Sequence, residues 1–259
     1  MFIDSHCHLD FPELHAQRDG VFSLMRENAV THALTISTTL KTFAAVRAVA
    51  ETHENVWCTA GVHPDERVDD REVTIGELVT MAAHPKVVGI GETGLDYYRL
   101  PEPLDWQRER FRTHIRAARE TGLPLIIHTR NASADTLKLM REENAAAARG
   151  VMHCFTETQE VADAAMSMGF MISFSGIVTF KSAKDLQEVA RRIPLDLMLI
   201  ETDSPYLAPA PHRGKMNQPG YVRHVAEFIA QLRGESVETI AQATRENFFR
   251  LFAKAVPVS

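Results

Sequence analysis

Short apolar or β-branched runs alternate along this chain with longer stretches in which apolar residues recur at helical spacing. The runs that predict strands are Phe2–His8, Ala33–Ser37, Val56–Val62, Val87–Glu92, Pro124–His128, Gly150–Cys154, Phe170–Ser175 and Leu197–Glu201. Helices are predicted between and after them, over Gly20–Ala29, Thr42–Thr52, Ile75–Ala83, Trp106–Glu120, Ser133–Glu143, Gln159–Met168, Lys184–Arg191, Tyr221–Arg233 and Val237–Lys254. Strands that are each followed by a helix predict an α/β fold with a parallel sheet.

The number and spacing of these elements favour a closed (β/α)8 TIM barrel. The chain has 259 residues, and a single barrel of this kind uses about 250. We therefore expect one metal-dependent hydrolase barrel domain over residues 1–259. An open, doubly wound sheet is the alternative fold. No G-x-G-x-x-G sequence follows the first predicted strand, which argues against dinucleotide binding.

Histidines and carboxylates follow the predicted strands at their carboxyl ends. Six of the eight runs finish in this way, with His6 and His8, His63, Glu92, His128, His153, and Glu201 with Asp203. In a (β/α)8 barrel these ends converge on one mouth, where active sites are built. The sequence therefore predicts that these side chains meet.

His6 and His8 form the first pair of candidate metal ligands. Alternation along a strand points both imidazoles to one face, and two neutral imidazoles are a good beginning for a divalent metal site. A pair of hydrogen-bonded core histidines is the alternative. Asp4 is expected on the same face, either orienting a ligand imidazole or serving as a buried structural carboxylate.

Glu92 is the natural bridge between two cations, because a carboxylate can offer one oxygen to each. It ends a run typical of a strand buried on both faces, where an unpaired charge is costly; an ion pair with an arginine is the alternative. Closure of the barrel would place Asp203 beside the first strand, unless that aspartate only caps the following turn. The two predicted metal sites are then His6, His8, Glu92 and Asp203, and Glu92, His128 and His153.

Basic residues near the same mouth are candidates for substrate binding. Arg130 lies two positions beyond His128 and should face the mouth, where a guanidinium can clamp a phosphate. His63 is either an extra ligand or a phosphate donor. Arg213 and Lys215 belong to a basic turn suited to contacts with a nucleic-acid strand, or to a solvated loop.

Composition narrows the function further. The formal net charge of −6 argues against a broad basic surface that coats nucleic acid. It permits a small pocket that grips a strand end, because divalent ions would reverse the local sign of charge. The three cysteines are expected to be reduced thiols. The sequence lacks a long apolar run, a secretion signal and a heptad seam, so we expect a cytoplasmic monomer without membrane contact.

These motifs together resemble those of the TatD family of metal-dependent deoxyribonucleases, within the amidohydrolase-like barrels. The resemblance runs from Met1 to about Phe252. It is carried by Asp4-Ser5-His6-Cys7-His8-Leu9-Asp10, Gly61-Val62-His63-Pro64, Gly89-Ile90-Gly91-Glu92-Thr93-Gly94-Leu95-Asp96-Tyr97, Ile127-His128-Thr129-Arg130, His153-Cys154-Phe155, Glu201-Thr202-Asp203-Ser204-Pro205-Tyr206 and Pro211-His212-Arg213-Gly214-Lys215 with Asn217.

The resemblance implies a phosphodiesterase with 3′-to-5′ exonuclease action on single-stranded DNA, with RNA as a further possible substrate. It matches the family's metal ligands to His6, His8, Glu92, His128, His153 and Asp203, and places His63 and Arg130 near its phosphate-binding positions. It also implies two divalent ions, Mg²⁺ or Mn²⁺, although a histidine-rich site readily takes Zn²⁺. Asp203 is then the expected general base and Glu92 the bridging catalytic carboxylate.

Two other functions fit the same residues. A metal pair polarises a carbonyl as readily as a phosphoryl group, so an amidohydrolase, lactonase or esterase acting on a small molecule or an acylated nucleic acid is the alternative enzyme. A barrel whose metals only stabilise the fold is the third interpretation. Arg130, Arg213 and Lys215 favour an anionic substrate.

Overall fold

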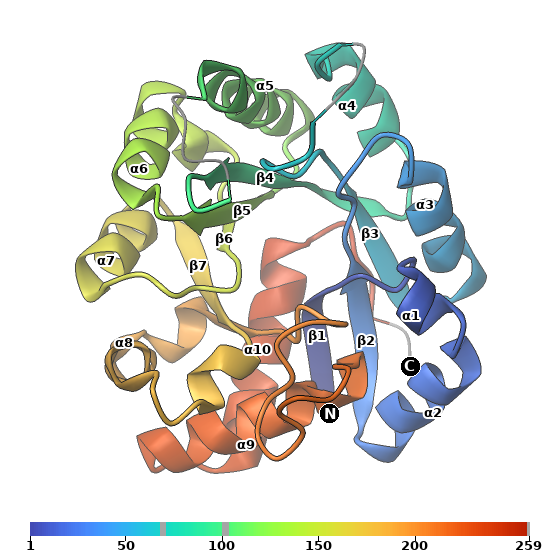
Figure 1. Cartoon of the computed structure of the whole chain (residues 1–259), viewed down its shortest axis with the longest axis vertical. Helices are drawn as coiled ribbons and strands as arrows, with labels where there is room; N and C mark the ends of the chain where they lie inside the picture. Colours follow the sequence, from blue (N-terminus) through green and yellow to red (C-terminus); the bar gives the residue numbers. More distant parts are fainter. Residues whose placement is uncertain (68–70, 100–103, 258–259) are drawn as a thin grey trace.

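The computed structural model describes residues 1–67, 71–99 and 104–257. Eight strands form one parallel sheet in which each strand pairs with the next along the chain (Figure 1). The strands are β1 (Phe2–Cys7), β2 (Val30–Thr35), β3 (Val56–Ala60), β4 (Val87–Asp96), β5 (Leu125–Arg130), β6 (Gly150–Met152), β7 (Phe170–Phe174) and β8 (Met198–Ile200). The order confirms the predicted succession of strands.

Helices surround the strands on the outside of the ring, except the last one, which lies behind the strands in this view (Figure 1). They are α1 (Pro12–His15), α2 (Arg18–Glu27), α3 (Phe43–Thr52), α4 (Ile75–Ala82), α5 (Asp105–Thr121), α6 (Ser133–Glu142), α7 (Gln159–Ser167), α8 (Lys184–Arg192), α9 (Val222–Arg233) and α10 (Val237–Leu251). Short 3₁₀ turns lie at Ala145–Ala147, Gly176–Thr179, Leu195–Leu197 and Pro219–Tyr221. No helix in the described part of the chain is both long and apolar enough to cross a membrane.

The ring closes where the last strand meets the first. Cys7 and Ser204 form a parallel bridge just beyond β8. The amide of His8 donates to Ser204 O (2.9 Å), and the amide of Asp203 donates to His6 O (2.9 Å). The (β/α)8 barrel is therefore confirmed and the open sheet is wrong. The predicted barrel domain ends at residue 259, and residues 258 and 259 lie outside the described part of the chain.

Apolar side chains fill the amino-terminal half of the barrel. Each strand or its immediate end contributes to one buried cluster, with Ile3, Leu34, Ile36, Trp57, Val88, Ile126, Val151, Met171 and Leu199. The end of α10 closes this cluster from below with Phe248, Leu251 and Phe252, and Figure 1 shows that helix behind the strands. Apart from the buried His32, which stacks on Trp57 with 5.6 Å between centroids, this half is filled with apolar side chains, and the candidate ligands lie at the carboxyl-terminal mouth.

A bulge in β1 corrects one prediction. Ile3 packs in the barrel interior, whereas Cys7 packs in the outer layer against the helices, although both would face the same way in a regular strand. The pairing with β2 shifts between Asp4 and Cys7, and an extra residue there inverts the alternation. Asp4 therefore faces away from His6 and His8, and the prediction of a common face is wrong.

Asp4 has a structural role instead. Its carboxylate accepts hydrogen bonds from the Thr202 amide (2.9 Å), the Thr202 hydroxyl (2.5 Å) and the His6 amide (3.2 Å). These bonds join β1 to the segment after β8. The second of its two predicted roles, the buried structural carboxylate, is the one the structure supports.

β4 extends four residues beyond its predicted end at Glu92. Thr93 to Asp96 pair with Ile127 to Arg130 of β5. Gly94 makes the close approach possible: a Cβ at this position would lie 1.9 Å from His128 O, and its φ is +135°. The long strand presents Glu92 and Asp96 beside His128.

Candidate metal centre

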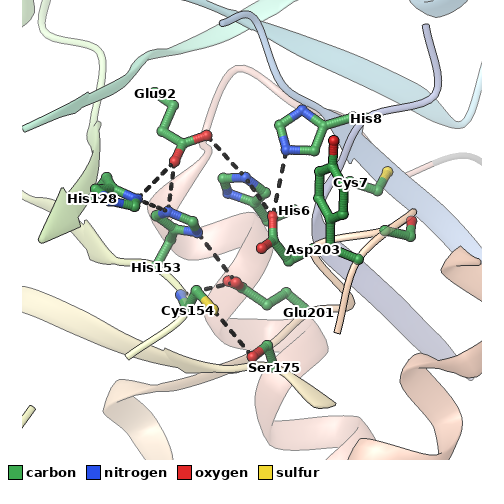
Figure 2. A network of polar contacts seen from close by, with 12 residues as sticks. His6, Cys7, His8, Glu92, His128, His153, Cys154, Ser175, Glu201 and Asp203 are labelled. Carbon is green, nitrogen blue, oxygen red and sulfur yellow. Dashed lines mark hydrogen bonds and ion pairs between the residues drawn. The ribbon is translucent and has the colours of Figure 1, made fainter. Parts of the chain in front are cut away.

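Six predicted ligands meet at the mouth of the barrel around Glu92 (Figure 2). Glu92 Oε1 lies 2.8 Å from His153 Nε2, 3.2 Å from His128 Nδ1 and 3.3 Å from His63 Nε2. Its other oxygen lies 3.3 Å from His6 Nε2. One oxygen of this carboxylate thus faces three imidazoles, and the other faces the imidazole of His6 on β1.

Asp203 completes the group on the β1 side. Its Oδ1 lies 3.4 Å from His8 Nε2 and 3.6 Å from His6 Nε2. The ring of His6 also stacks on that of His153, with 3.9 Å between centroids. The barrel closure seen at Cys7 and Ser204 is what brings residues about two hundred positions apart into contact.

The donor atoms fit divalent cations. Three groups have ligand atoms within 4.8 Å of one another: His6, His8 and Asp203; His63, Glu92 and His128; and His6, His153 and Glu201. Both ring nitrogens of His6, and Nδ1 of His8, are buried without a hydrogen-bond partner among the described residues. Buried polar nitrogens that lack partners are costly unless they bind an ion or water, and imidazole with carboxylate is a donor set for transition metals.

Carboxylates behind the ligands fix two of the imidazoles. Asp96 Oδ2 lies 3.2 Å from His128 Nε2, and Glu201 Oε1 lies 3.2 Å from His153 Nδ1. Glu201 also accepts a hydrogen bond from the Cys154 amide (2.8 Å). A carboxylate on the far nitrogen sets the orientation and tautomer of a ligand histidine and raises its basicity. Each ring is thereby aimed at Glu92.

The charges of the group favour ionised carboxylates. Burial alone would raise the pKa of Glu92, but His153, His63 and His6 bring it well below its usual range. The pKa of Asp203 is likewise lowered, because the hydrogen bond from His8 and the charges of nearby histidines outweigh its burial. Both groups therefore carry the negative charge that a cation requires at neutral pH.

His63 is held by a further chain of polar contacts. Its Nδ1 contacts Asp65, which in turn contacts the guanidinium of Arg99. Burial opposes protonation of His63, but Glu92 and Asp65 raise its pKa to about 9. The structure thus places this residue in the group around Glu92, in contact with a carboxylate on each side of its ring.

Helix α5 positions the loop that carries His63. The neutral ring of His114 donates from Nδ1 to Arg110 O (2.8 Å) and accepts at Nε2 from the Val62 amide (3.0 Å). The buried guanidinium of Arg110 donates to His63 O (2.9 Å) and to Glu66 O (2.6 Å). The loop after β3 is therefore tied to α5 on both sides of His63.

Asn217 holds the turn that carries Asp203. Its buried side-chain amide donates to Thr202 O (2.9 Å) and Tyr206 O (2.6 Å). Its backbone amide donates to Pro205 O (3.0 Å). Three bonds from one residue fix the backbone on both sides of Asp203, so this carboxylate is held by a rigid turn.

A cavity of about 430 Å³ opens directly above the ligands. Arg130 lies in its wall together with His63 and Arg99, so it faces the mouth as predicted, and its guanidinium stacks on Tyr98 at 3.9 Å; phosphate binding by Arg130 stays a prediction. Arg213 and Lys215 are exposed and lie outside the residues that line this cavity. Arg213 stacks on Phe180 at 4.0 Å. Substrate contact by these two residues stays a prediction.

Sequence patterns missed several residues that shape the site. Asp96 lies on the same face of β4 as Glu92, because the strand continues to Asp96. The predicted strand ends at Glu92, so the alternation of faces was not extended to Asp96. Glu201 follows the last predicted strand, but no local pattern gives it a role. Arg99, Arg110 and His114 carry no local signal, because Asp65, His63 and Val62, which they contact, come from other parts of the chain. Asp65 is close to His63 in the sequence, but no motif marks it.

Comparison with known proteins gives one consistent result. The family model described as TatD related DNase matches residues 3–253. The uncharacterized metal-dependent hydrolase YcfH of Escherichia coli strain K12 is 49% identical over 253 residues, covering 96% of this chain and 95% of its own. The 3′-5′ ssDNA/RNA exonuclease TatD of Escherichia fergusonii is 32% identical, covering 91% and 92%. The crystal structure of YjjV, a TatD homologue from E. coli K12, superposes with a TM-score of 0.91 at 28% identity, covering 99% and 98%.

Proposed function

This chain belongs to the family of TatD-related DNases, which are metal-dependent hydrolases, and on that premise we propose that it is a two-metal phosphodiesterase that shortens single-stranded nucleic acid from its 3′ end. The observation that carries the proposal is Glu92, whose two oxygens face separate groups of ligand atoms beneath an open cavity. DNA is the proposed substrate, with RNA as an extension; an exonuclease acting on both is among the relatives.

The ligands would divide between two ions. His6, His8 and Asp203 with Glu92 would hold one, and Glu92, His128 and His153 the other, with His63 within reach of the second. Mg²⁺ or Mn²⁺ is proposed, with Zn²⁺ compatible with so many imidazoles. When bound, such ions lower the pKa of water towards neutrality and neutralise charge that develops on a phosphate.

The protein's own groups would then handle the proton and the substrate. Asp203 lines the cavity with its Oδ1 3.4 Å from His8 Nε2, and its lowered pKa favours the carboxylate that would accept the proton of the attacking water. Arg130 in the cavity wall would clamp a phosphate oxygen, and His63 in the same wall is the second residue proposed to contact the phosphate. Two guanidinium groups in the wall, those of Arg99 and Arg130, favour an anionic phosphodiester over a neutral amide or lactone.

Two isosteric variants test this proposal. Glu92→Gln and Asp203→Asn should remain folded while losing at least about 100-fold in kcat, the loss usual for removal of a general base. Glu227→Gln is a matched control, because it removes a carboxylate that pairs with Arg223 and His224 on α9, away from the cavity.

The assay would use metal-reconstituted protein with 3′-labelled and 5′-labelled single-stranded DNA and RNA, and a panel of amides and lactones. Shortening of a 5′-labelled strand one nucleotide at a time is the expected result. Turnover of the small molecules alone would replace the nuclease with an amidohydrolase or lactonase. Full activity in the variant that carries both substitutions would remove the two carboxylates from the mechanism.

A further inference from the structure

Two exposed tyrosines stand beside the mouth of the barrel. Among the described residues, the exposed large apolar side chains are Met1, Tyr98, Tyr206 and Val256. Met1 and Val256 lie near the chain ends, where exposure is common. Tyr206 is 55% exposed and lines the cavity above the ligands. An exposed ring alone means little, so its surroundings decide its meaning.

Tyr206 forms an aromatic corner with Phe11. The two rings are nearly perpendicular, with an interplanar angle of 77° and 6.2 Å between centroids. Phe11 in turn stacks on His8 at 4.6 Å. Phe11 and Tyr206 both line the cavity, so a continuous aromatic wall runs from a candidate metal ligand to the rim.

The backbone of this corner is held in place. The Tyr206 amide donates to Asp203 O (3.0 Å), and Tyr206 O accepts from Asn217 (2.6 Å). The aromatic ring and the Asp203 carboxylate therefore project from the same fixed turn. A planar group on Tyr206 would keep a constant position relative to the ligands, because the turn need not reorganise when it binds.

The second tyrosine is arranged differently. Tyr98 lies under the guanidinium of Arg130, which covers its ring at 3.9 Å, and it does not appear among the described residues that line the cavity. Its face is already occupied by a cation. Of the two exposed tyrosines, Tyr206 alone turns an aromatic surface to the cavity within the described part of the chain.

We infer that Tyr206, backed by Phe11, is the stacking site for the unpaired nucleobase next to the scissile phosphate. The inference rests on the proposed function, and adds what the site recognises besides phosphate. Every nucleobase has an aromatic face, so stacking binds a strand without reading its sequence. A paired base is not free to leave its stack without cost, so this corner also selects single strands.

The test compares intact and abasic oligonucleotides in the same enzyme. Deoxyoligonucleotides would carry a stable abasic residue at the 3′-terminal or at the penultimate position, on the two sides of the first scissile phosphate. The ratio of kcat/KM for the intact and the abasic strand measures recognition of the base. Because both values come from one preparation, a general loss of activity or metal cancels in this ratio.

The wild-type protein should prefer the intact strand by about 5- to 150-fold at one of the two positions, the range that corresponds to stacking of one base. Tyr206→Ala should bring that ratio close to one. Tyr206→Phe keeps the ring and should keep the ratio. Tyr98→Ala removes a similarly exposed tyrosine that does not line the cavity, and it should leave the ratio of intact to abasic kcat/KM unchanged.

The outcomes separate this inference from the proposed function. A wild-type ratio near one at both positions, an unchanged ratio in Tyr206→Ala, or an equal loss in Tyr98→Ala would each overturn the stacking site while the nuclease activity stands. A wild-type protein that hydrolyses none of the strands would overturn the proposed function, and the stacking site with it.

Discussion

Replacing His114 by glutamine tests how the loop that carries His63 is stabilised. His114 is fully buried, with an acceptor on one side of its ring and a donor on the other. Only the neutral ring satisfies both partners, because a protonated Nε2 would face the Val62 amide hydrogen. Burial, together with the charge of Arg110, lowers the pKa of His114 from 6.5 to about 4. Protonation is thus coupled to unfolding.

The sign and size of the effect follow from this difference. Below pH 6.5, His114 binds a proton in the unfolded chain but stays neutral in the folded protein. The free energy of unfolding therefore decreases as the pH is lowered from 6.5 to about 4. Between pH 7.5 and 5, a shift of this size costs the wild-type protein about 2 kcal/mol. Glutamine cannot titrate. The variant's free energy of unfolding is lower by about 1–3 kcal/mol at pH 7.5 because hydrogen bonds are broken, but it lacks the pH dependence that His114 contributes.

Urea unfolding of both proteins with a chelator, at intervals from pH 7.5 to 5, measures the difference directly. All other titrating groups are shared and cancel in the difference between wild type and variant. The free energy of unfolding of the wild type minus that of the variant should decrease by about 2 kcal/mol as the pH is lowered from 7.5 to 5. A difference that is constant with pH would refute a neutral, doubly bonded His114. The exposed His15→Gln is a suitable control, because its ring is outside the core.

Two further predictions concern residues behind the ligands. Glu201→Gln should weaken divalent-metal binding by about 10- to 100-fold, because His153 loses the charge that orients it; titration calorimetry measures this, and unchanged affinity would contradict the role. Asn217→Ala removes one buried and one part-buried hydrogen bond from the Asp203 turn, so the free energy of unfolding should fall by about 1–3 kcal/mol and kcat should fall more than KM changes. Urea unfolding and steady-state kinetics test this; lost stability with unaltered kcat would make Asn217 structural only.

The positions of the ligands could be predicted because they depend on local patterns and one topological rule. His6, Glu92 and Asp203 each lie at the carboxyl end of a predicted strand, and a parallel barrel brings the carboxyl ends of all its strands to one mouth. The rule needs no knowledge of individual contacts. Glu92 and Asp203 accordingly lie 3.3 Å and 3.6 Å from His6 Nε2, although they come from opposite parts of the sequence.

The direction of a side chain was less certain than its position. Alternation predicts a face only while the strand is regular, and one inserted residue inverts it. The bulge in β1 therefore turned Asp4 away from His6, and no residue type in that run signals it. Asp96 was missed because the predicted β4 ends too early, at Glu92. The glycines that allow β4 to approach β5 closely are also typical of strand ends, so they did not indicate that the strand continues.

The sequence by itself determined the barrel, the family and the candidate ligands at the strand ends, because periodicity and strand-end chemistry are properties of short segments. The tertiary structure alone decided which group orients which ligand: Glu201 for His153, Asp96 for His128, and His114 for the loop of His63. The last of these pairings joins a helix to a loop about fifty positions away. Contacts of this kind form only when the packed chain brings the two residues close together. Their separation along the sequence does not indicate how close they are in the folded protein.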